Sequence, residues 1–107
     1  MGVGERHIKG MVARNEDELQ VMRQLASSGR DHPVLMLNVN RYRVDSGFPD
    51  QPPYVDYMEC LEDLVRSVGG RIEKRMLVLG QPVGRQPPAH EILAIWYPSN
   101  QAYLDLP

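Results

Sequence analysis

Polar side chains follow an apolar start in the segment 34–42, and they are the first candidates for binding a small molecule. Asn38, Asn40 and Tyr42 would share one face of a strand, because successive strand side chains point to opposite sides. Buried amides need hydrogen-bond partners, and an unfilled pocket would offer these amides to a ligand. The commoner alternative is that such side chains bond to the backbone or line a seam between two subunits.

Further candidates lie near the ends of other predicted elements. Trp96 is the only tryptophan and stands near the end of an apolar run, where core packing is the commonest role. Tyr57 begins a helical face, so its ring could join the core while its hydroxyl reaches a pocket mouth. The sequence identifies no catalytic residue. The candidates for lining a ligand pocket are Asn38, Tyr42, Tyr57, His90 and Trp96.

The sequence shows no pattern of metal-ligating residues. His7, His32 and His90 lie far apart, and none has a neighbour at ligand spacing. Cys60 has no base nearby in sequence, so a packing or surface thiol is expected rather than a nucleophile. We therefore expect neither a metal nor a cofactor.

Composition limits the possible partners and locations. The net charge of -2 comes from 14 acidic and 12 basic side chains mixed along the chain, which argues against a nucleic-acid partner. The apolar runs are far shorter than the roughly twenty residues of a membrane-spanning helix. The segment 1–10 lacks the apolar centre of a secretory signal, and a single cysteine suits a reducing compartment. We expect a cytoplasmic protein that contacts no membrane.

Apolar spacing and turn residues predict the elements that would position these side chains. Apolar residues at three- and four-residue spacing indicate helices, and β-like runs bounded by Pro or Gly indicate strands. The segment 6–13 could be extended, and 45–53 reads as a surface loop. The predicted elements are a helix at 16–27, a strand at 34–42, a helix at 54–68, strands at 71–83 and 91–97, and a helix at 100–104.

Three segments in this order resemble a known superfamily. Pro33–Asn38 opens the pattern, Gly69–Arg71 joins helix to strand, and Trp96–Tyr103 closes it. Together they resemble the dimeric α/β-barrel superfamily, and most closely the uncharacterised family called domain of unknown function 1330. The resemblance implies an α+β, ferredoxin-like protomer whose antiparallel sheet packs against the sheet of a second copy to form a barrel.

The resemblance covers several activities and fixes none of them. Superfamily members include cofactor-free monooxygenases, haem-degrading monooxygenases, lactone isomerases and chlorite dismutases. Haem-degrading members place a tryptophan against the cofactor and an asparagine on the first strand, which Trp96 and either Asn38 or Asn40 could match. Their histidine on the last helix has no counterpart in this sequence.

The sequence departs from the family pattern at its end, where the last helix and a fourth strand are shortened or missing. Either the chain is truncated or shortened, or the segment 6–13 fills the vacant sheet edge, which we favour because unpaired edges invite aggregation. We divide the chain into an N-terminal extension with one helix, residues 1–32, and a ferredoxin-like domain, residues 33–107.

Two functions are compatible with these observations. The first is a small-molecule enzyme or binding protein of the dimeric α/β-barrel type, for which the fold suggests cofactor-free oxygenation or isomerisation. The alternative is a non-catalytic homodimeric ligand-binding or interaction module. Both need a homodimer formed through the sheet face, because a few short strands with apolar side chains on both faces leave one face uncovered.

Overall fold

A computed structural model describes residues 16–107 of the chain. The segment 6–13, which we predicted to be extended and to fill the vacant sheet edge, lies outside the described residues. The structure contains α2 (Glu16–Ser27), β1 (Val34–Asn40), the short 3-10 turn η1 (Val44–Ser46), α3 (Tyr54–Ser67), β2 (Arg71–Leu77), β3 (Glu91–Tyr97) and α4 (Asn100–Leu104).

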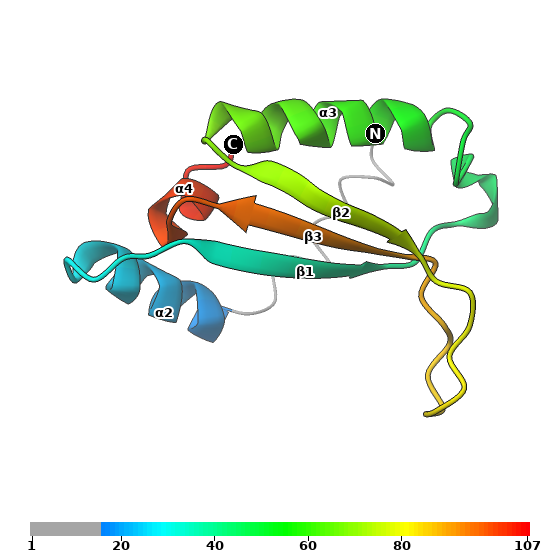
Figure 1. Ribbon diagram of the computed structural model, residues 1–107, viewed down its shortest axis with the longest axis horizontal. Helices are drawn as coiled ribbons and strands as arrows, with labels where there is room; N and C mark the ends of the chain where they lie inside the picture. The colour runs from blue at the N-terminus through cyan, green and yellow to red at the C-terminus, as the bar shows by residue number, and fades with distance from the viewer. Residues whose placement is uncertain (1–15) are drawn as a thin grey trace.

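The three strands form one antiparallel sheet in the order β1-β3-β2, and α3 lies along one of its faces (Figure 1). The described chain therefore has an α+β fold, which is compatible with a ferredoxin-like protomer. The smaller helices α2 and α4 pack against each other at the end of the sheet where β1 begins.

Most of the predicted elements are confirmed. The helices at 16–27 and 100–104 and the strand at 91–97 have the predicted bounds, β1 ends two residues before the predicted end, and α3 ends one residue before it. Gly69 follows α3 with φ of 84°, a backbone conformation that suits glycine at a helix end. Along β1, half-buried and exposed residues alternate from Val34 to Asn40, so the predicted division into two faces is correct.

The predicted strand 71–83 is wrong beyond Leu77, where β2 ends. Gly80 and Pro82 follow within five positions, and proline has no N–H to continue a strand ladder. A register shift lies between Ile72 and Lys74. Ile72 pairs with Ile95 on the face under α3, whereas Met76 falls on the opposite face.

The hydrophobic core lies between α3 and the sheet. Val65 of α3 and Leu93 and Ile95 of β3 are its largest fully buried side chains. Burying each such side chain contributes roughly 1.5–3 kcal/mol of stability. The other buried members of this core are Tyr54, Met58, Tyr97 and Ala102.

A carboxylate fixes the chain before β1 to the start of α4. The Oδ1 atom of Asp31 accepts hydrogen bonds from the Asn100 backbone N–H at 2.7 Å and side-chain amide at 2.8 Å, and Oδ2 accepts from the Gln101 N–H at 3.1 Å. The Ser99 hydroxyl caps the same helix by accepting from the Ala102 N–H at 2.9 Å. These contacts join the predicted extension 1–32 to the domain. Among residues 16–107, no helix is long and apolar enough to span a membrane.

Candidate functional site

A buried carboxylate lies at the end of the sheet beneath the start of α3. Glu91, the first residue of β3, is only 3% exposed. The Tyr54 hydroxyl donates to its two carboxylate oxygens at 2.9 and 2.7 Å, and the Tyr42 hydroxyl donates to Oε1 at 2.7 Å. Hydrogen bonds of this kind compensate the loss of hydration that a buried charge suffers.

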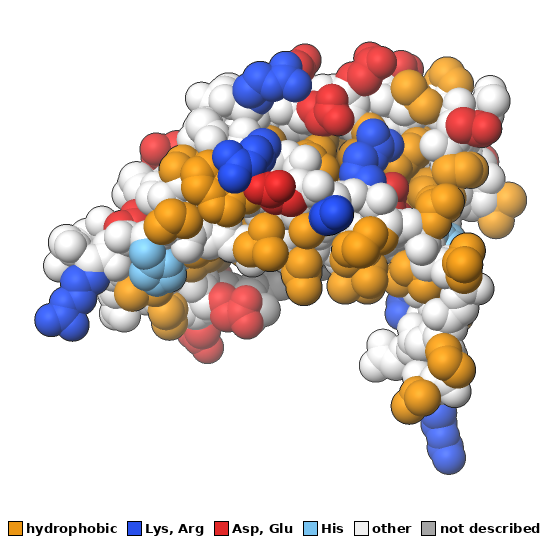
Figure 2. All heavy atoms as spheres, in the orientation of Figure 1, with side chains coloured by type: hydrophobic (Ala, Val, Ile, Leu, Met, Phe, Trp, Pro, Cys, Tyr) orange, Lys and Arg blue, Asp and Glu red, His pale blue; other side chains and the backbone are white. Residues whose placement is uncertain are grey.

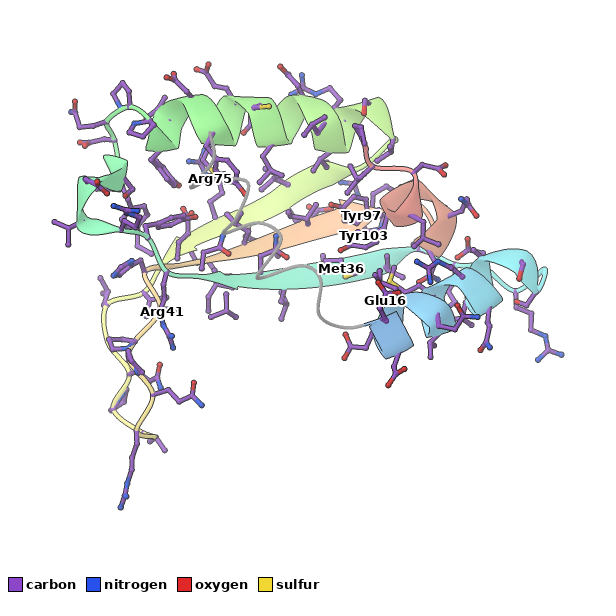
Figure 3. All side chains as sticks on the ribbon, turned by 180° about the vertical axis from the view of Figure 1, so that it is seen from behind. Glu16, Met36, Arg41, Arg75, Tyr97 and Tyr103 are labelled. Atoms are coloured by element: carbon purple, nitrogen blue, oxygen red, sulfur yellow. The ribbon has the colours of Figure 1, made fainter. Side chains whose placement is uncertain are left out.

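A second layer of donors holds the two tyrosine hydroxyls. The Asn40 amide donates to the Tyr42 hydroxyl at 3.1 Å, and the Arg75 guanidinium donates to the Tyr54 hydroxyl at 3.1 Å. Arg75 projects from β2 beneath α3 (Figure 3). The cluster formed by Asn40, Tyr42, Tyr54, Arg75 and Glu91, called the Glu91 cluster below, thus joins all three strands to the helix.

Both hydroxyls of the Glu91 cluster remain protonated at neutral pH. Burial raises the pKa of Tyr42, and its hydrogen bond to Glu91 raises the pKa further. Burial also raises the pKa of Tyr54, and although the hydrogen bond from Arg75 opposes this effect, the pKa stays above its ordinary value. The same hydrogen bond raises the pKa of Arg75. The cluster is therefore a carboxyl group held by neutral phenol donors, with a guanidinium beside it.

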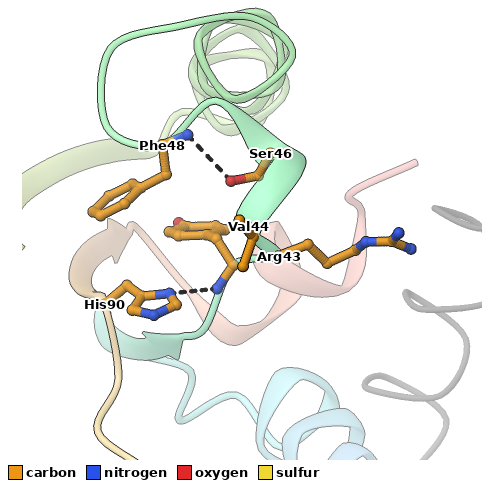
Figure 4. A pocket seen from close by; sticks show the side chains of 6 residues that line it. Arg43, Val44, Ser46, Phe48 and His90 are labelled. Carbon is orange, nitrogen blue, oxygen red and sulfur yellow. Dashed lines mark hydrogen bonds between the residues drawn. The ribbon is translucent and has the colours of Figure 1, made fainter.

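Aromatic rings surround the cluster and line a shallow surface hollow of about 200 Å³ (Figure 4). The Tyr42 ring is stacked on Phe48 with centroids 4.8 Å apart, and Tyr54 meets both rings edge-on at 5.1 and 5.0 Å. The residues that line the hollow are Tyr42, Arg43, Val44, Ser46, Phe48 and His90.

His90 has a defined tautomer at the edge of this hollow. Its Nδ1 atom accepts a hydrogen bond from the Tyr42 backbone N–H at 2.7 Å, so the proton of the neutral ring lies on Nε2. The residue is exposed, and its Nε2–H can act as a donor to a molecule in the hollow.

The structure brings together some of the five predicted pocket residues. Tyr42 and His90 both line the hollow, and Asn38 lies on the same sheet face, where it pairs with Leu93. Trp96 lies on the opposite face, with the Arg71 guanidinium 4.3 Å from its ring centroid. Asn38 and Trp96 are therefore separated by the sheet and do not share a pocket within one chain.

Tyr57, the fifth predicted pocket residue, also lies outside the hollow. Its side chain is on α3, is 48% exposed and does not line the hollow. Burial raises the pKa of its hydroxyl, and the nearby thiol of Cys60 adds to this effect. No group of three or more metal-ligating side chains comes together among residues 16–107.

Glu91 and Phe48 are site residues that the sequence analysis did not select. Glu91 is the first residue of an otherwise apolar strand and lies on the same face as Leu93 and Ile95, two and four positions later. Its position alone therefore predicts that it faces the core. A core-facing acid requires donors, and this signal could have identified the cluster. Phe48 lies in a loop without periodicity, and only the fold places it against Tyr42.

Comparison with known proteins supports the fold alone. No protein-family model matches the chain, and none of the curated proteins has a significantly similar sequence. A structural-genomics crystal structure of a protein of unknown function from Rhodopseudomonas palustris is similar, with a TM-score of 0.64. The match covers 86% of this chain and 72% of that chain at 20% sequence identity. At this identity the similarity shows a shared α+β fold and carries no information about activity.

Proposed function

We propose that the protein works as a homodimeric module in which two copies pack through the sheet face that α3 leaves uncovered. The observation that carries this proposal is a row of apolar side chains on β1. Leu35, Leu37 and Val39 are 57%, 64% and 62% exposed, and all point away from α3. A sheet normally buries its apolar face against another layer, so this row needs a cover.

The row continues across the sheet. Its cross-strand partners on β3 are Trp96, Ala94 and Ile92, and Met76 of β2 lies beside Ile92. Figure 2 shows hydrophobic side chains gathered along the sheet. A second copy is the simplest cover, because a two-fold axis requires only one self-complementary patch. The resemblance to the dimeric α/β-barrel superfamily and its domain of unknown function 1330 branch supports the same arrangement.

The decisive experiment compares the native mass spectrum of the gently purified protein with that of Leu37→Asp. We expect a dimer for the unmodified chain and a folded monomer for the variant, because burying a carboxylate without partners in an apolar interface is strongly unfavourable. Val44→Asp adds the same charge at a fully exposed apolar position outside the sheet and should remain dimeric. A monomeric unmodified protein at micromolar concentration would refute the proposal.

The aromatic hollow favours a second candidate function, in which the dimer also binds a small molecule there. Tyr42 and Phe48 offer apolar ring surface, and His90 offers a donor nitrogen. A volume of about 200 Å³ is below the roughly 300 Å³ of typical ligand pockets, which restricts the site to a small ligand. If the site catalyses, the resemblance suggests cofactor-free oxygenation or isomerisation by a cytoplasmic enzyme.

The same mass spectrum tests this second candidate when an absorption spectrum is recorded alongside. A retained small ligand would appear as added mass on the dimer, and the added mass should disappear in Phe48→Ala. Tyr57→Ala, a half-exposed aromatic position outside the hollow, is the matched control and should retain the ligand. Added mass that survives Phe48→Ala would place the ligand elsewhere and contradict the assignment.

A further inference from the structure

An arm projects from the sheet between β2 and β3. It comprises residues 78–90 and points away from α3 in both views of the ribbon (Figures 1 and 3). Its base is fixed by the Val78 N–H, which donates to the His90 carbonyl at 3.0 Å, and by Arg41, which donates to the Pro87 carbonyl at 2.6 Å. The arm is therefore attached firmly to the body at one end only.

The arm exposes apolar side chains that nothing among residues 16–107 covers. Leu79 and Val83 are 99% and 82% exposed. Figure 2 shows hydrophobic side chains both on the sheet and along the arm. The arm therefore extends the same uncovered apolar surface that we propose as the dimer interface.

The arm does not lengthen the sheet of a partner. Pro82, Pro87 and Pro88 have no backbone N–H, so the arm cannot form a regular ladder of hydrogen bonds. A contact of the arm with another chain would therefore be made chiefly through its side chains.

The position of the arm relative to α2 indicates which surface it meets. The arm and α2 both lie on the side of the molecule away from α3, at opposite ends of the strands (Figures 1 and 3). Suppose that two copies pack through their uncovered faces about a two-fold axis that lies between the faces and runs perpendicular to the strands. This axis places one end of the strands in the first copy over the opposite end in the second copy. This operation brings the arm of each copy to the end of the dimer that holds α2 of the other copy.

The length of the arm is sufficient for this contact. Packed sheets lie about 10 Å apart, whereas the segment 78–85 can extend over roughly 26 Å. The arm therefore reaches past the sheet of a second copy to the elements beside it.

The charges of the two surfaces are complementary. Arg85 is the single charged residue between positions 78 and 89. The first turn of α2 carries Glu16, Asp17 and Glu18, and α2 also exposes the apolar side chain of Val21 at 54%. The arm thus offers apolar side chains and one cation, and α2 offers an exposed apolar side chain and acidic groups.

We propose that the arm is an exchanged clasp, which in the homodimer lies on α2 of the second copy. Leu79 and Val83 contact the apolar side chains of that helix, and Arg85 lies near its acidic first turn. This inference rests on the dimer proposed above and adds the segment that makes each copy hold the other.

Cysteine cross-linking between two chains tests the contact directly. Cys60 is exposed and is first changed to serine. Val83→Cys is made in one chain and Gln20→Cys in another, and the two proteins are mixed and oxidised. We expect a covalent dimer from the mixture and much less from either protein alone, because the contact joins the arm of one copy to α2 of the other. No enrichment of the covalent product in the mixture would overturn the clasp.

Dimer affinity gives an independent measurement that separates this inference from the dimer itself. Leu79→Asp should raise the dimer dissociation constant about a hundredfold, because the lost contact occurs twice in each dimer. Val44→Asp is again the charge control and should leave the constant unchanged. If the unmodified protein is monomeric, both proposals fail. If Leu37→Asp dissociates the dimer while Leu79→Asp does not, the clasp alone is refuted.

Discussion

The hydroxyl of Tyr54, the first residue of α3, donates to both carboxylate oxygens of Glu91, the first residue of β3, across 37 positions of the chain. This contact fixes where the helix begins over the central strand. It also places a buried carboxyl group where it depends on its neighbours for hydrogen bonds, which makes the contact suitable for testing.

Replacement of the Tyr54 hydroxyl should destabilise the fold. Tyr54→Phe removes a donor from a buried carboxylate, and we expect the free energy of unfolding to fall by about 1.5–3 kcal/mol. Urea unfolding followed by circular dichroism measures the change. Tyr57→Phe is the matched control, because this half-exposed tyrosine has no hydrogen bond from its hydroxyl within residues 16–107, and it should change stability by less than ~0.5 kcal/mol.

A double-mutant cycle with Glu91→Gln identifies the source of that loss. Because Tyr54 and Glu91 contact each other directly, the two changes should not be additive. Strictly additive losses would show that the hydrogen bond between them contributes nothing to stability.

Gly70 should not tolerate a side chain. A Cβ atom at this position would lie 2.7 Å from the Trp96 carbonyl oxygen and 2.9 Å from Val65 Cγ1. Gly70→Ala should therefore cost about 1–3 kcal/mol, measured by thermal or urea unfolding. Gly80→Ala, whose Cβ would meet no atom within 4 Å, should be neutral or slightly stabilising. Equal effects of the two changes would contradict the packing described at the junction of α3 and β2.

Acid should weaken the attachment of α4. Desolvation acts to raise the pKa of Asp31, but the hydrogen bonds from Asn100 and its neighbours outweigh this effect and lower the pKa from 3.8 to about 2. A lowered pKa stabilises the folded state above the unfolded value, and this contribution is lost as the pH falls from about 3.8 to about 2. Urea unfolding across this window should show less loss for Asp31→Asn than for the unmodified chain. Identical pH dependence would contradict the prediction.

Alkali should weaken the core around Tyr97, which is 2% exposed. Burial raises its pKa from 10.0 to about 12, and the nearby hydroxyl of Tyr103 adds to this effect. The unfolded chain therefore ionises first, so the stabilising contribution is complete below pH 10.0 and is lost as the pH rises to about 12. Tyr97→Phe should reduce the loss of stability in this window, measured by urea unfolding. A loss as steep as in the unmodified chain would assign the effect to the other tyrosines.

The sequence by itself determined most of the helices and strands, because their signals are local. Periodic apolar residues and the glycines after α3 predicted bounds that the structure reproduces to within one or two residues for every α-helix and strand except β2. The predicted strand extended beyond the end of β2 because the apolar residues after Leu77 still favour a strand, whereas Gly80 and Pro82 cannot continue the ladder. The faces of β1 were predictable for the same local reason, since strand side chains alternate.

Only the tertiary structure decided which polar residues meet. Glu91 is the first residue of β3, Tyr54 is the first residue of α3 and Tyr42 follows β1. No spacing in the sequence relates these three residues. The sequence analysis placed Asn38 and Trp96 in one pocket. Antiparallel pairing instead places the two side chains on opposite faces of the sheet. Local chemistry fixes which way a side chain points along its own element, whereas the register between elements fixes its neighbours.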